Sequence, residues 1–83
     1  MKNTELNEMF LSLYRLHRRV GATTSADSQL IKTQDGVTLI VYEFGRENSD
    51  RKHVYRLNGE DDGKVYSEAV EHLCDVLKER YIA

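Results

Sequence analysis

Apolar residues recur at the spacing of one helical face near both ends of the chain. In residues 4–20 they are Leu6, Met9, Phe10, Leu13, Leu16 and Val20, and in residues 63–81 they are Tyr66, Ala69, Val70, Leu73, Val76 and Leu77. A repeat of three or four residues places such side chains on one stripe of an α-helix. The pattern therefore predicts a helix at each end. Gly21 is expected to end the first helix, because glycine readily takes the left-handed conformation that stops one.

Between the two helices, the pattern changes to short runs rich in β-branched and aromatic residues, which are typical of β-strands. They occupy residues 29–33, 37–44 and 51–58. Asp35 and Gly36 favour a two-residue hairpin turn between the first two runs. The predicted fold class is therefore α+β: one domain over residues 1–83, with the order helix, three-stranded antiparallel meander, helix (α-β-β-β-α). Both helices are expected on one face of the sheet.

The middle predicted strand is apolar on both of its faces. One face carries Ile31, Ile40, Tyr42 and Phe44, together with Tyr55 and Leu57. The other face carries Leu30, Val37, Leu39 and Val41, together with Val54. Two helices on one side leave the second face open, and an exposed apolar face usually marks a contact surface.

The choice between the two sheet faces rests on side-chain size. The face with Ile31, Tyr42 and Tyr55 has the larger side chains and makes the better core. That choice predicts an outward contact surface of Leu30, Leu39, Val41 and Val54. In the alternatives, the helices cover both faces of the sheet, or the third strand pairs in another register.

A second candidate contact surface lies on the first predicted helix. Leu11, Tyr14 and Arg18 follow a spacing of three then four residues, so they share a stripe away from the apolar face. Tyrosine and arginine are enriched at the energetically important positions of protein interfaces. The ordinary alternative is an arginine stem that lies over an exposed tyrosine.

Composition and charge are those of a small globular protein. The chain has 83 residues, of which 31% are charged, with a net charge of −2 and a single cysteine, Cys74. Domains of this size are marginally stable and often gain stability by self-association. One thiol gives no sign of an oxidising compartment, no apolar run approaches a membrane span, and the first residues lack a signal-peptide pattern. The expected location is the cytoplasm, with no membrane partner.

No motif in the sequence predicts chemistry. His17, His53 and His72 fall on three different predicted elements, and no pair has the helical spacing of metal ligands. Cys74 flanks the apolar face of the second helix, where a cysteine usually acts as a small hydrophobic residue. The five glycines form no phosphate-binding loop. Catalytic residues, metal ligands and cofactors are therefore all predicted to be absent, and the chain is not expected to be an enzyme.

Basic residues support a rival hypothesis, nucleic-acid binding. They are Arg15, Arg18 and Arg19 in the first helix and Arg51, Lys52 and Arg56 around the third strand. The order of elements across residues 4–81 resembles that of the double-stranded-RNA-binding domain. That family has a Lys/Ala-rich start to its last helix, where this chain has Gly-Lys-Val-Tyr-Ser-Glu-Ala at residues 63–69, preceded by three acidic residues. The resemblance therefore covers the order of elements and not the phosphate-binding end.

The favoured hypothesis is a small non-enzymatic protein that binds another protein or a second copy of itself as a homodimer. It would act as an adaptor, a regulator or an inhibitor of a larger complex, as small phage inhibitors do. Its contact surface would be the open sheet face or the stripe of Leu11, Tyr14 and Arg18. Nucleic-acid binding through the arginines is the second hypothesis, and it requires an affinity that falls steeply with salt.

Overall fold

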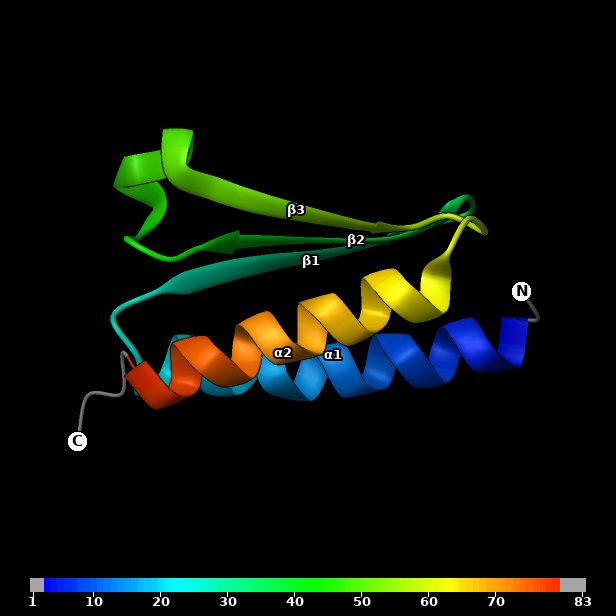
Figure 1. Cartoon of the computed structure of the whole chain (residues 1–83), viewed down its shortest axis with the longest axis horizontal. Helices are drawn as coiled ribbons and strands as arrows, with labels where there is room; N and C mark the ends of the chain where they lie inside the picture. The colour runs from blue at the N-terminus through cyan, green and yellow to red at the C-terminus, as the bar shows by residue number, and fades with distance from the viewer. Residues whose placement is uncertain (1–2, 80–83) are drawn as a thin grey trace.

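The computed structural model describes residues 3–79, without the side chains of Asn3, Thr4 and Ser49 (Figure 1). In chain order its elements are α1 (Asn3–Thr23), β1 (Asp27–Thr33), β2 (Gly36–Tyr42), the 3-10 helix η1 (Arg46–Arg51), β3 (Lys52–Leu57) and α2 (Asp62–Glu79). The predicted α+β class and α-β-β-β-α order are thereby confirmed. The last two residues of the second predicted helix, 80–81, lie outside the described residues.

The molecule has two layers, a sheet and a pair of helices. Both helices run along the same side of the sheet, as Figure 1 shows. The antiparallel strands follow the order β1-β2-β3, α1 packs against β1, α2 packs against β3, and the helices contact one another. The expectation that both helices share one face is therefore confirmed. Over the residues that the structure describes, neither helix is long and apolar enough to cross a membrane.

The hairpin between β1 and β2 turns one residue earlier than expected. Gly36 pairs with Thr33, so Gln34 and Asp35 form the turn and Gly36 begins β2. Gly36 has a φ of 149°, and a Cβ atom added to it would lie 1.9 Å from the carbonyl oxygen of Leu57. The glycine is therefore required by the close approach of β3 and not by the turn itself.

The sheet face that packs on the helices is the opposite of the expected one. The buried core contains Val37, Leu39, Val41 and Leu57 from the strands and Leu13, Val20, Ala69, Leu73 and Val76 from the helices. Leu30 and Tyr55 are half-buried against it. The prediction that Leu30, Leu39 and Val41 point outward is wrong, since Leu39 is only 1% exposed and all three lie on the helix side of the sheet.

The error came from the register of β3. Leu57 pairs with Val37 and Tyr55 pairs with Leu39, so both large side chains belong to the face of Leu39. A shift of one residue along a strand moves every side chain to the other face. Once Tyr55 and Leu57 change sides, the larger side chains favour the face that the helices do cover.

The end of α1 lies at Thr23, beyond the predicted end at Gly21. The helix continues through Gly21 to Thr23. The Thr23 hydroxyl donates to the carbonyl of Arg19 at 2.6 Å, and the buried Thr24 hydroxyl donates to the carbonyl of Val20 at 2.7 Å. Both hydroxyls thus bond back to carbonyls one turn earlier, and the Val20 carbonyl also accepts from the backbone N–H of Thr24 at 3.1 Å.

Candidate functional site

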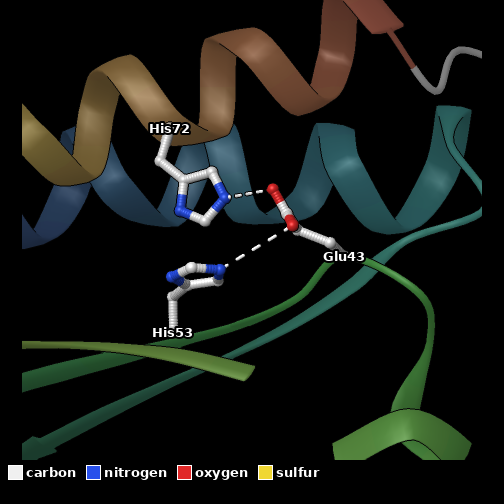
Figure 2. A group of neighbouring side chains, drawn as sticks. All are labelled: Glu43, His53 and His72. Carbon is white, nitrogen blue, oxygen red and sulfur yellow. Dashed lines mark hydrogen bonds and ion pairs between the residues drawn. The ribbon is translucent and has the colours of Figure 1, made fainter. Parts of the chain in front are cut away.

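Three polar side chains meet at the end of the sheet where β2 finishes and β3 begins. Glu43 directly follows β2, His53 is the second residue of β3, and His72 lies in α2. His53 pairs with the buried Val41, which places it on the helix side of the sheet, and α2 packs against β3. Figure 2 shows the Glu43 carboxylate reaching both imidazole rings.

The distances within this Glu43 cluster (Glu43, His53 and His72) are short. Nε2 of His72 lies 2.7 Å from Oε1 of Glu43, and Nε2 of His53 lies 3.7 Å from Oε2. The two rings meet edge to face, with centroids 4.7 Å apart. The side chain of His72 is 13% exposed and that of His53 is 52% exposed. The cluster is therefore closed toward α2 and open to solvent at β3.

Tyr55 holds the other side of the His72 ring. Its hydroxyl lies 2.6 Å from Nδ1 of His72. Burial raises the pKa of Tyr55, and the charges of Glu68 and Glu43 raise it further, so the phenol keeps its proton at neutral pH. Because a carboxylate only accepts, a neutral His72 ring donates from Nε2 to Glu43 and accepts from Tyr55 at Nδ1. Both ring nitrogens are thus bonded, and the ring is fixed in place.

The Glu43 cluster has the donor set of a metal site. One ligand atom from each of its three side chains lies within 4.8 Å of the other two. Imidazole nitrogen and carboxylate oxygen are ligands of zinc and similar divalent ions. The expectation of no metal ligands considered spacing along single elements, whereas these three donors come from three segments that only the fold brings together.

A second histidine contact lies at the other edge of the sheet. Nδ1 of His17 in α1 is 2.6 Å from the hydroxyl of Ser28 in β1. Burial lowers the pKa of His17, with Asp27 acting in the opposite direction, while Arg46 and Arg18 lower it further. Ser28 is 1% exposed, so no substrate can reach its hydroxyl. The pair ties α1 to β1 and offers no nucleophile.

The sheet face away from the helices is a candidate contact surface. We call it the open face and define it by Ile31, Ile40, Lys52, Val54 and Arg56. Ile40 pairs with Val54, and Ile31 pairs with the neighbouring Thr38. Val54 is 41% exposed and Ile31 is 37% exposed. Of the predicted sheet contact residues, Val54 is the only one on this face.

Positive charge lies along one edge of the open face, on β3. Lys52 and Arg56 are exposed, and among the described residues neither belongs to an ion pair. Arg46 is paired with Asp27 at 2.7 Å, and its guanidinium covers the ring of Tyr42 at 5.0 Å. The open face thus combines an aliphatic centre with two uncompensated cations on β3.

The predicted helix stripe forms as its spacing indicated. Leu11 and Tyr14 are exposed on α1. The Arg18 guanidinium lies 5.9 Å from the centroid of the Tyr14 ring, which is the arrangement of the ordinary alternative, an arginine lying over a tyrosine. Cys74, expected to act as a small hydrophobic residue, is exposed on α2.

The fold separates the two groups of basic residues proposed for nucleic acid. Arg15, Arg18 and Arg19 are exposed on α1, in the helix layer against β1. Lys52 and Arg56 belong to β3 at the opposite edge, and their side chains lie on the open face. Arg51 ends η1, where its guanidinium stacks 4.6 Å from the Phe44 ring centroid. The sheet therefore stands between the groups, and they do not form one basic surface.

Spacing within single predicted elements does not reveal the Glu43 cluster, because its three members come from different segments of the chain. One signal was available in the sequence. In an antiparallel meander, residues that flank the connection between neighbouring strands come close in space. Glu43 and His53 flank the connection between β2 and β3 in that way.

Comparison with known proteins identifies no relative. No protein-family model, no curated protein and no solved structure matches this chain. Proposals about function therefore rest on the geometry of the open face and of the Glu43 cluster.

Proposed function

We propose that the protein is a small non-enzymatic binding protein that docks its open face on an acidic surface of another protein. In this role it acts as an adaptor or as an inhibitor that occupies a surface of a larger complex. The observation that carries the proposal is the combination on one exposed sheet face of an aliphatic centre and uncompensated positive charge.

The aliphatic centre supports a contact function. A sheet with one solvated face normally alternates apolar residues inward with polar residues outward. Here β2 and β3 place Ile40 and Val54 side by side on the outward face, and β1 adds Ile31. Removing apolar surface from water contributes roughly 25 cal/mol per Å². A partner that covered these three side chains would therefore gain affinity from their burial.

The charge on the open face indicates which partner fits. Lys52 and Arg56 lie two residues to either side of Val54, so they flank it on the same face of β3. In a symmetric homodimer the same surface is shared by both copies, and an arrangement that places β3 over β3 would bring these cations together. Like charges in an interface oppose binding, whereas a complementary acidic surface favours it. An acidic protein partner is therefore preferred to a second copy of the chain.

Nucleic acid fits the open face less well than an acidic protein. Proteins that bind single strands stack bases on exposed aromatic side chains. The centre of the open face is aliphatic, and Tyr42 on the same side of the sheet is only 8% exposed, beneath the guanidinium of Arg46. Two cations are also few for a surface whose affinity comes from phosphate contacts.

Site-specific photo-cross-linking tests the proposal. A benzophenone amino acid replaces Val54 on the open face or, as the matched control, the exposed Ser67 on α2. Each variant is irradiated in an extract of the cells that naturally produce the protein, and the adducts are identified by mass spectrometry. A second pair of variants carries Arg56→Glu or, for the same change in net charge on α2, Lys64→Glu.

The expected result is a protein cross-linked from position 54 and not from position 67. The adduct should persist with Lys64→Glu, disappear with Arg56→Glu and form again with the purified partner. A nucleic-acid adduct, an adduct between two copies of the chain, or equal adducts from both positions would each contradict the proposal.

A further inference from the structure

We propose that Glu43, His53 and His72 bind one divalent transition-metal ion, with zinc as the best fit. The site lies on the helix side of the sheet, so it is separate from the open face and does not depend on the proposed docking function. Two imidazole nitrogens and one carboxylate oxygen supply three ligands. A fourth position is left toward solvent at the exposed ring of His53.

The distances between the donor atoms suit a small ion. Zinc binds nitrogen and oxygen at about 2.0–2.2 Å in tetrahedral geometry, which separates neighbouring ligand atoms by about 3.4 Å. Nε2 of His72 lies 2.7 Å from Oε1 of Glu43, and Nε2 of His53 lies 3.7 Å from its other oxygen, Oε2. One ligand atom from each of the three side chains lies within 4.8 Å of the other two, so side-chain shifts on the order of 1 Å would bring the three to the tetrahedral separation. His53 is half exposed and is free to make such a shift.

Tyr55 provides the outer support that a ligating histidine needs. Histidine ligands usually donate their other ring nitrogen to an acceptor, which fixes the tautomer and the orientation of the ring. With a metal on Nε2 of His72, the ring proton resides on Nδ1, which lies 2.6 Å from the Tyr55 oxygen. A tyrosine hydroxyl both donates and accepts, so Tyr55 supports the ring with or without the ion.

The surroundings of the Glu43 cluster select for ions that prefer nitrogen ligands. A shallow hollow of about 320 Å³ opens beside the cluster and is lined by Glu43, Phe44, Asp50, Arg51, Lys52 and His53. With two imidazole nitrogens and one carboxylate, the cluster offers too few oxygen ligands for hard ions such as calcium and magnesium, which need six or more oxygens, or an octahedral shell of oxygens and water. Zinc and its neighbours in the periodic table bind imidazole strongly enough to use a site with two histidines.

The competing explanation is a purely structural hydrogen-bond chain. In it, the bonds from Tyr55 to His72 and from His72 to Glu43 hold α2 against the sheet without any ion. His53 separates the two explanations. Its Nε2 is 3.7 Å from Glu43, which is too long for a hydrogen bond, so a structural chain does not need it. A metal site does need it as a ligand.

A zinc titration of the full chain, purified without a histidine tag, tests the proposal. Zinc is added in competition with a chromophoric chelator, and cobalt(II) absorption reports the coordination geometry. The variants are His53→Ala, Glu43→Gln and Tyr55→Phe, with His17→Gln as the matched control for losing a histidine elsewhere. Circular dichroism checks that each variant is folded.

We expect one zinc per chain, unchanged stoichiometry and affinity in His17→Gln, and loss of stoichiometric binding in His53→Ala. Glu43→Gln should lose it as well. Tyr55→Phe should weaken binding by about 10–100-fold, the effect typical of residues that position a ligand. The proposal is overturned if the wild type takes up no zinc at micromolar concentrations, or if folded His53→Ala binds zinc as the wild type does.

Discussion

The three histidines show how the same side chain takes different roles in different surroundings. His72 is held at both ring nitrogens, by Glu43 and by Tyr55. His53 faces solvent across the same carboxylate. His17 is tied to Ser28 in a setting that disfavours its charged form. Nothing in the identity of neighbouring residues along the chain distinguishes these three settings, because each partner comes from a distant segment.

Protonation of His17 is expected to destabilise the fold. Burial lowers its pKa in the folded state below the ordinary value of 6.5. The unfolded chain therefore binds the proton more readily, so the contribution of His17 is complete above the unfolded pKa and is lost as the pH falls through and below it.

The measurement is the free energy of urea unfolding at about pH 7.5 and at about pH 5.5, on either side of the ordinary histidine pKa. The wild type should lose more stability between these values than His17→Gln, in which His53 and His72 still titrate. Equal losses in the two proteins would show that the pair with Ser28 does not sense pH.

At the scale of elements, the repeat of apolar residues along the chain predicted the helices and strands, because local spacing determines them. Both helices follow from the repeat of apolar residues, and their bounds differ from the prediction by only a few residues within the described part of the chain. The strands and their order were also predictable. The face on which β3 presents its side chains was not, because the pairing of β3 with β2 depends on contacts between distant residues that no local pattern records.

The contact between Gly36 and Leu57 is one such non-local determinant. Gly36→Ala would place a methyl group against the Leu57 carbonyl oxygen at a φ that side chains rarely adopt. We expect a loss of about 1–3 kcal/mol in the free energy of unfolding, as is typical of strained backbone positions.

Gly21→Ala is the matched control, since Gly21 lies inside α1 with open space around it. Alanine there should raise stability by about 0.5–1 kcal/mol, the usual difference within a helix. Denaturant unfolding of both variants checks the pair. If Gly36→Ala left the free energy of unfolding unchanged, β3 would be able to move away from the hairpin without loss of stability.

At the scale of the whole molecule, the sheet has one face buried against the helices and one face exposed. The sequence predicted that one apolar face would remain uncovered, and in the structure one does. It predicted the wrong face, since β2 is apolar on both sides and the choice rested on the register of β3. The strand connection could have placed Glu43 near His53, but not His72, because the Glu43 cluster exists only where the end of β2, β3 and α2 meet.

Shortening a side chain to alanine should lower the free energy of unfolding much more on the helix side of the sheet than on the open face. Leu39→Ala removes a side chain that is fully enclosed by the helices, and large-to-small changes of this kind cost about 2–5 kcal/mol. Ile31→Ala on the open face should stay within roughly 0.5 kcal/mol, as surface changes usually do. Equilibrium unfolding of both variants measures the contrast. Similar losses would indicate that the open face is covered in solution, for example by a second copy.

The strand order β1-β2-β3 has a consequence for behaviour at high concentration. Among the described residues 3–79 it leaves the outer backbone of β1 and β3 without strand partners, and an unprotected edge of this kind invites pairing between molecules. Charged side chains on edge strands discourage that pairing, and β3 carries Lys52 and Arg56. The two cations proposed for partner recognition are thus also expected to discourage edge-to-edge pairing of β3 between molecules. Neutralising them in search of tighter binding would raise the tendency of the protein to aggregate.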